Sequence, residues 1–141
     1  MEITINYFAI VLAALSTMFV GSVWYTPKVF GNTWMKLAKV DPNQKVSGWS
    51  MTSLLGGAFL TSLITAFVLA YFAGVTHKAF GGSFLNGALF VGLLGWLGFT
   101  ATRIHMHDSF EGRRKKLTSL NIAHEFVAIM IMALIIGVMG I

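Results

Sequence analysis

The chain has 141 residues and a net charge of +5, with 56% hydrophobic residues and only 11% charged residues. Soluble domains carry about 25% charged residues, so this composition excludes an ordinary water-soluble domain and indicates an integral membrane protein. The absence of cysteine excludes disulfides and Cys-ligated zinc or iron–sulfur sites. The basic residues lie in short clusters between apolar runs, which is typical of membrane-span flanks, so we expect no nucleic-acid partner.

Four apolar runs are each long enough to cross about 30 Å of hydrocarbon, which takes about 20 helical residues. They cover approximately residues 3–25, 50–74, 83–104 and 119–141. We therefore expect an all-α polytopic protein, with residues 1–141 forming a single membrane domain. The first run follows no basic residue and precedes no convincing small-residue cleavage site, so we interpret it as a retained span rather than a signal peptide.

The basic residues predict an orientation. Nine of the ten Lys and Arg residues lie in loops 26–49 and 105–118 or at the adjoining end of the third span, and only Lys78 lies on the other side. The positive-inside rule then predicts that these two loops are cytoplasmic. Both termini would lie outside the cytoplasm, in a bacterial-type plasma (inner) membrane.

Small and hydroxyl-bearing residues recur along one face of three spans. Such stripes allow helix backbones to approach closely in lipid. They could pack within the bundle or across a homodimer, or their hydroxyl groups could line a pore. The positions are Ala9, Ala13, Thr17 and Gly21; Ser53, Gly57, Thr61 and Thr65; and Ala88, Gly92, Gly95 and Thr102.

The segment after the first span is predicted to lie at the membrane surface. Pro27 ends the span, and residues 28–40 then separate apolar from basic side chains at helical spacing. This pattern predicts an interfacial amphipathic helix, with a re-entrant plug or gate as the alternative. The residues expected at the lipid interface are Trp24, Tyr25, Phe30, Trp34, Lys36 and Lys39.

The same segment resembles a known family. The pattern Gly21-x-x-Trp24-Tyr25-Thr26-Pro27, followed by Phe30-Gly31 and Trp34, is similar to that of the bacterial and fungal membrane family called domain of unknown function 1761. A second match is Glu111-Gly112-Arg113, in the basic segment before the last span. The resemblance covers nearly the whole chain and implies a small four-span protein. It implies no activity, because the family has none established.

Glu125 is the acidic residue expected nearest to the hydrocarbon, at or just below its boundary. Together with Arg103, Asn121 and His124 it forms a candidate functional polar cluster. One interpretation is structural, with an Arg103–Glu125 ion pair or a carboxylate that reaches the interface. The other is a proton-linked or cation-binding carboxylate.

Histidines suggest a second possible site. His105, His107 and Asp108 follow the third span and His124 lies in the fourth, so closure of the hairpin could bring them together. Imidazole and carboxylate ligands suit zinc or another divalent transition metal, and the histidines could also bind haem. The alternative is that they are bystanders at the interface. No other cofactor is expected.

The sequence has no phosphate-binding loop, zincin motif or nucleophile elbow, so we make no enzymatic assignment. The leading functional hypothesis is a homo-oligomeric or accessory helical bundle in the lipid bilayer, with another copy or another membrane protein as partner. The first alternative is a small transporter or channel that uses Glu125. The second is metal or haem binding through His105, His107 and His124.

Overall fold

The computed structural model describes residues 2–41, 48 and 50–140, and its regular elements are all helical. Four helical stretches are long and apolar enough to cross a membrane, the third being a continuous run over Phe84–Phe110. The prediction of an all-α protein with four membrane-spanning helices is therefore confirmed. The elements are α1 (Tyr7–Trp24), α2 (Gly31–Ala38), α3 (Met51–Phe80), α4 (Phe84–Gly95), the π-helix η1 (Trp96–Ala101), α5 (Thr102–Phe110) and α6 (Lys115–Met139).

Polar side chains cap three of these helices at their N-termini. The side chain of Asn6 accepts a hydrogen bond from the backbone N–H of Ala9, so α1 begins at Tyr7 rather than near residue 3. Ser50 and Ser53 form a reciprocal capping box at the start of α3. Ser83 caps α4 in the same way as Asn6 caps α1. These caps explain why the helices begin where they do.

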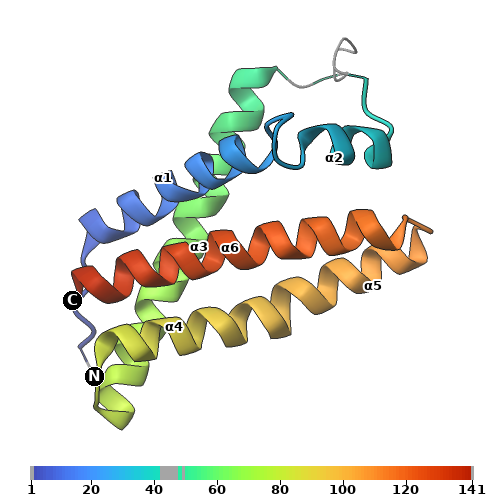
Figure 1. The fold of residues 1–141 in the computed structure, drawn as a ribbon. Helices are drawn as coiled ribbons and strands as arrows, with labels where there is room; N and C mark the ends of the chain where they lie inside the picture. The colour runs from blue at the N-terminus through green and yellow to red at the C-terminus, as the bar shows by residue number, and fades with distance from the viewer. Residues whose placement is uncertain (1, 42–47, 49, 141) are drawn as a thin grey trace.

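Both chain termini and the α3–α4 turn lie at one end of the molecule, and α2 and the α5–α6 turn lie at the other (Figure 1). Helices α4 and α6 lie side by side and pack most closely where they carry small residues. A Cβ added at Gly92 would lie 2.9 Å from the Cβ of Ala133, and one added at Gly137 would lie 2.9 Å from the Cα of Leu85. The small residues on these two helices therefore allow close backbone approach, as expected of helix packing in lipid.

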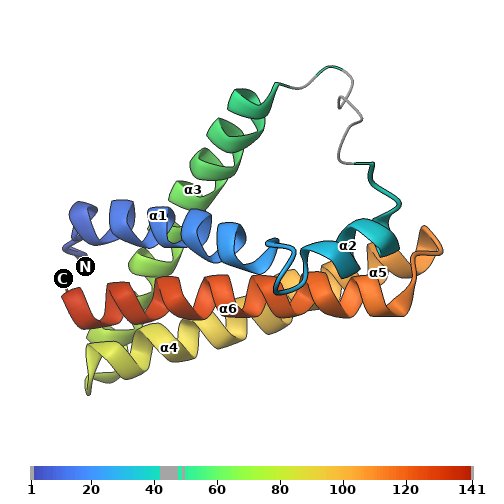
Figure 2. The same ribbon diagram turned by 45° about the horizontal axis from the view of Figure 1, so that its top comes forward.

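Helix α3 departs from the bundle. Its second half packs through Ala66, Leu69, Ala70 and Ala73, but residues 51–58 are all exposed. Figures 1 and 2 both show its first turns leaning away from α1 and α6. A Cβ added at Gly57 would meet nothing within 4 Å. The Ser53-to-Thr65 stripe is therefore not the packing face within this chain, because small residues permit close approach but supply little surface that must be buried.

Most of the segment 105–118, which was expected to be a loop, is helical. Helix α5 continues to Phe110 and α6 begins at Lys115, so only four residues join them. Hydropathy marks where the hydrocarbon ends, whereas α5 ends at Phe110, two residues before Gly112, whose φ of 66° is a left-handed conformation that suits glycine. Similarly, α3 runs beyond residue 74, so Lys78 lies in its last turn.

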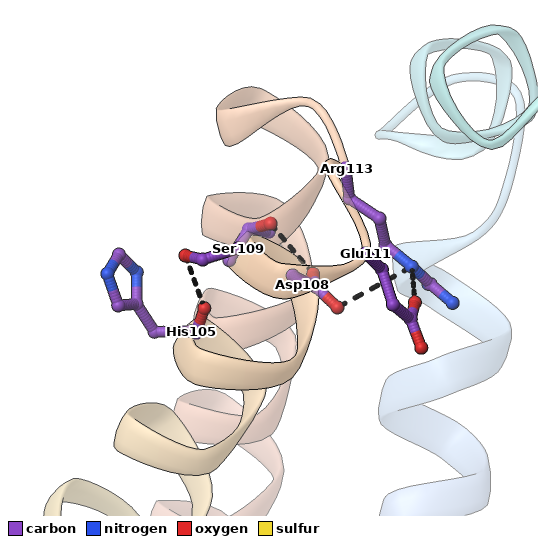
Figure 3. Close-up of polar contacts among 6 residues, drawn as sticks. His105, Asp108, Ser109, Glu111 and Arg113 are labelled. Atoms are coloured by element: carbon purple, nitrogen blue, oxygen red, sulfur yellow. Dashed lines mark hydrogen bonds and ion pairs between the residues drawn. The ribbon is translucent and has the colours of Figure 1, made fainter.

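The α5–α6 hairpin is closed by a buried carboxylate. The hydroxyl of Thr118 donates a 2.7 Å hydrogen bond to Oδ2 of Asp108, and the backbone N–H of Arg113 donates to the carbonyl of Asp108. The guanidinium of Arg113 lies 3.6 Å from Oδ1 of Asp108 and 2.6 Å from Glu111 (Figure 3). Asp108 is thus part of the turn's own framework.

Candidate functional site

The segment after α1 forms a compact turn before the chain enters α2. The N–H groups of Val29 and Gly31 both donate to the carbonyl of Thr26, at 3.1 and 2.9 Å, and that of Phe30 donates to Trp24. A Cβ at Gly31 would overlap the carbonyl oxygen of Tyr25, so this position requires glycine. Helix α2 therefore begins at Gly31 rather than at residue 28.

This turn brings four aromatic rings together, and we call Trp24, Tyr25, Phe30 and Trp34 the aromatic turn. The ring centroid of Phe30 lies 4.5 Å from that of Trp24, and the ring of Trp34 lies 5.3 Å from that of Tyr25. Both Trp24 and Tyr25 also contact His124 of α6, at 5.7 and 5.1 Å between ring centroids. Two rings of the aromatic turn therefore contact a histidine of the last span.

His124 is paired with its neighbour Glu125. Nδ1 of His124 lies 3.3 Å from Oε1 of Glu125, and the two side chains are 14% and 40% exposed. An ionised carboxylate can only accept hydrogen bonds, so Nδ1 is the donor and Nε2 of a neutral imidazole presents a lone pair. Glu125 therefore fixes which nitrogen of His124 carries the proton.

Two buried polar atoms at this site have no hydrogen-bond partner among the residues that the structure describes. They are Nε2 of His124 and Nε1 of Trp24. Leaving a buried donor or acceptor unpaired costs about 1–3 kcal/mol. A Cβ added at Gly21 would lie 3.7 Å from Nε2, so α1 passes close to the imidazole at a residue without a side chain. These two atoms can therefore form hydrogen bonds with polar groups from outside the chain, such as water or a ligand.

The hydroxyl of Tyr25 keeps its proton in this environment. Burial raises the pKa of Tyr25 above its ordinary value of 10.0, and the carboxylate of Glu125 raises that pKa further. Tyr25 therefore remains a neutral hydrogen-bond donor next to Glu125.

The side chains of Tyr25, His124 and Glu125 line a groove that we call the α1–α3–α6 groove. Its volume is about 930 Å³, and Trp34 of α2 and Thr100 of η1 also contribute to its wall. Its further hydroxyl groups come from Thr17, Ser22, Thr61, Ser62 and Thr65. Its apolar surface comes mainly from Met18, Met51, Leu54, Leu55, Ile129 and Met132.

Two contacts fix the helices around the groove. The hydroxyls of Thr17 and Ser62 lie 2.8 Å apart where α1 meets α3. On α6, the carbonyl of Ile122 accepts a 3.1 Å hydrogen bond from the indole N–H of Trp96, whose ring packs against Phe126 at 4.8 Å. Trp96 opens the π-helix η1, and it holds α6 on both sides of the His124–Glu125 pair.

The structure brings together only part of the predicted polar cluster. His124 and Glu125 are adjacent, and Asn121 lies half-buried on α6 without contributing to the groove. Arg103 is exposed on α5, and the side chain that lies within hydrogen-bond distance of Glu125 is that of His124. The proposed Arg103–Glu125 ion pair is therefore wrong: extension of the helix through α5 leaves Arg103 on its outer surface.

The predicted metal ligands do not converge. Residues 2–41, 48 and 50–140 contain no group of three or more His, Asp or Glu side chains that could hold a metal ion. His105 and His107 are exposed on α5, and Asp108 is engaged in the hairpin. In Figure 3 the side chain of His105 points away from Asp108, and its carbonyl accepts from Ser109. His124 lies instead in the groove.

Sequence reasoning missed the contact between the aromatic turn and His124. Trp24 and Tyr25 were assigned to the lipid interface, and the sequence gives no signal that links them to a residue of the last span. It also missed Thr17 and Ser62 as a pair, because only Thr17 belongs to a recognised stripe. The feature of the sequence that indicated a further role for this region is the unusual density of aromatic residues between Trp24 and Trp34.

One comparison with known proteins finds a match. The model of a family described as "Protein of unknown function (DUF1761)" matches residues 8–137. That region includes the aromatic turn, the groove and the α5–α6 hairpin. No curated protein matches the chain, and no solved structure matches it.

Proposed function

This chain belongs to the DUF1761 family, a family of unknown function, and from its geometry we propose that it is a membrane-embedded binding protein. The α1–α3–α6 groove takes a small amphipathic molecule from the lipid, and His124 and Glu125 recognise the polar end of that molecule. The observation that carries the proposal is the buried, unpartnered Nε2 of His124 beside the groove's carboxylate.

The chemistry of the groove suits an amphipathic ligand. A carboxylate, an imidazole and a phenol lie together, and apolar side chains such as Leu54, Ile129 and Met132 extend from them. Small-molecule sites are typically about 300–1,000 Å³, mostly apolar and provided with a few convergent polar groups. The volume and lining of this groove agree with that description.

The level of the site in the bilayer follows from its aromatic residues. Trp and Tyr concentrate at membrane–water interfaces, so contact of Trp24 and Tyr25 with His124 supports an interfacial position for the His124–Glu125 pair. Helix α2 would then lie in the headgroup region, with Lys36 exposed. The exposed first turns of α3 leave the groove open to lipid at this level.

The orientation of this site is part of the proposal. The predicted basic segments are found at the same end of the molecule, since α2 and the α5–α6 turn lie together there (Figure 1). One of the nine basic residues, Lys45, lies outside the described residues. The positive-inside rule supports a cytoplasmic position for this end, with the groove open to the cytoplasmic leaflet of a plasma membrane.

The groove also supports the first step of the transporter hypothesis. Thr17, Thr61 and Thr65 line the same space as Glu125, so the hydroxyl groups and the carboxylate belong to one site. Binding is the step that this arrangement supports directly. Transport would require a second arrangement of α3 that opens the groove to the opposite leaflet.

A photolabelling experiment tests the binding proposal. The full chain is placed in phosphatidylcholine nanodiscs with a neutral alkyl alcohol that carries a diazirine near its hydroxyl, and adducts are located by mass spectrometry. We expect saturable labelling at Glu125 and Tyr25. Ala58→Trp, which fills the groove, should reduce it, and the exposed control Ala123→Trp should not. Unsaturable labelling spread over exposed residues such as Phe99 would contradict the proposal.

A homo-oligomer is the second candidate function, and the exposed face of α3 favours it. Residues 51–58 are all exposed, and a Cβ added at Gly56 or Gly57 would meet nothing within 4 Å, which leaves space for a close helix approach. The chain has no cysteine, so a single introduced cysteine can be cross-linked without background. If a second copy packs here, Gly57→Cys in native membranes should form a disulfide-linked dimer in high yield, unlike Phe99→Cys. Equal yields would count against this interface, leaving a helix of another membrane protein as the accessory alternative.

A further inference from the structure

We infer that the ligand of the α1–α3–α6 groove is a lipophilic organic cation, such as a protonated amine or a quaternary onium ion. This inference rests on the proposed binding function and adds the chemical class of the ligand. Three features of the site favour it: its charge, its aromatic surface and its unpaired acceptor.

The charge of the groove is opposite to that of the chain. The chain carries a net charge of +5, yet among the described residues that line the groove there is no Lys or Arg, and Glu125 is the one carboxylate. A site with one carboxylate and no Lys or Arg repels phosphate- and carboxylate-bearing amphiphiles and attracts cations, and the apolar walls strengthen both effects. Anionic lipid headgroups are therefore poor occupants.

Aromatic rings lie beside this carboxylate. Tyr25 and Trp34 both line the groove, and their rings are 5.3 Å apart in an edge-to-face arrangement. The faces of Trp and Tyr rings attract organic cations. Tyr25 is neutral, so it adds a ring and a hydroxyl without a competing charge. Carboxylate and rings together can stabilise a cation that has lost most of its water.

The unpaired Nε2 of His124 fits the protonated amines of this ligand class. It is an acceptor because Nδ1 donates to Glu125. The N–H of a protonated amine can therefore donate to Nε2 while the positive charge lies near Glu125. Glu125 also favours the imidazole tautomer that leaves this acceptor free. The acid and the histidine thus act on the same polar end of the ligand.

Tetraphenylphosphonium tests the inference, because tetraphenylborate has the same shape and the opposite charge. Binding of each ion to the full chain in phosphatidylcholine nanodiscs is measured by equilibrium dialysis against empty nanodiscs. We expect saturable binding of one tetraphenylphosphonium per groove and no saturable binding of tetraphenylborate. Glu125→Gln should weaken binding of the cation at least tenfold. The matched control Glu111→Gln removes an exposed acid of the hairpin and should leave binding unchanged.

Trp34→Leu is the second variant, and it keeps the experiment informative if Glu125→Gln unfolds. It should weaken cation binding several-fold without reducing labelling by the neutral diazirine alcohol. If both ions bind equally, or if neither variant weakens binding of the cation, the inference is overturned. Failure of the cation to bind while the neutral alcohol still labels Glu125 overturns the ligand class and leaves the groove as a binding site. Failure of both probes overturns the binding function itself.

Discussion

The rings of Tyr25 and His124 lie with their centroids 5.1 Å apart, although the two residues come from opposite ends of the chain. This contact joins the motif that follows α1 to Glu125, the one acid among the described residues that line the groove, since Glu125 is hydrogen-bonded to His124. The motif is therefore both the exit of the first span and one wall of a polar site.

Gly31→Ala should destabilise the protein and disrupt the aromatic turn. The added methyl group would overlap the carbonyl oxygen of Tyr25, and backbone cannot move aside as a flexible side chain can. Overpacking of this kind costs about 1–3 kcal/mol, and sometimes more. Thermal unfolding in detergent, followed by tryptophan fluorescence, measures the loss. Gly95→Ala is the control, because its added Cβ meets nothing within 4 Å; a melting temperature equal for the two variants would refute the proposed role of Gly31.

Asp108→Ala should weaken the α5–α6 hairpin. It leaves the buried hydroxyl of Thr118 without its acceptor, which costs about 1–3 kcal/mol in free energy of unfolding. Glu111→Ala removes only an exposed ion pair with Arg113 and should cost less than about 1 kcal/mol. Reversible unfolding in mixed detergent micelles compares the two. Equal losses would show that Asp108 is not the framework of the turn.

Glu125→Gln should lower the pKa of Tyr25. The pKa is raised first by burial and second by the charge of Glu125, so removing the charge should bring it closer to its ordinary value while burial still holds it above that value. Tyrosinate absorbance during alkaline titration reports this change. The chain has three tyrosines, so subtracting the titration of Tyr25→Phe isolates the signal. An unchanged titration would mean that the Glu125 carboxylate is not close to Tyr25.

The same raised pKa has a consequence for stability. A Tyr pKa that is higher in the folded state than in the unfolded chain means that the folded state holds its proton more tightly. The contribution of Tyr25 is then fully present below about pH 10, the ordinary Tyr value, and is lost as pH rises through the folded value. Tyr25→Phe should therefore flatten the decline of stability above that pH.

The sequence predicted the elements of the fold better than their arrangement. Apolar runs identify four spans because composition alone decides whether a helix can lie in hydrocarbon. Pro27 and the motif around it correctly indicate that the chain leaves the first span there. The same hydropathy placed the end of the third span near residue 104, although α5 continues to Phe110, because a helix does not end where its apolar character ends.

The sequence identified individual residues of the site but not the contacts between them. Glu125 was identifiable because a carboxylate near hydrocarbon is costly. Its partner was not, since the sequence suggested Arg103, whereas Arg103 is exposed on α5 and Glu125 contacts its neighbour His124. The departure of α3 was also hidden. Its Ser53-to-Thr65 stripe looks like a packing face, whereas the structure packs Ala66, Ala70 and Ala73.

The proposed function requires that the first turns of α3 stand away from α6 in a bilayer and leave a ligand groove beside Glu125. The most direct test is the distance between spin labels at Gly56→Cys on α3 and Ala123→Cys on α6, measured by double electron–electron resonance in nanodiscs. The exposed residues Phe72 and Leu134 provide a control pair where α3 and α6 belong to the packed half of the bundle. We predict a distribution centred on the separation in this structure, which narrows when tetraphenylphosphonium is added. A single short distance that indicates α3 packed along α6, unchanged by the ligand, would contradict the claim.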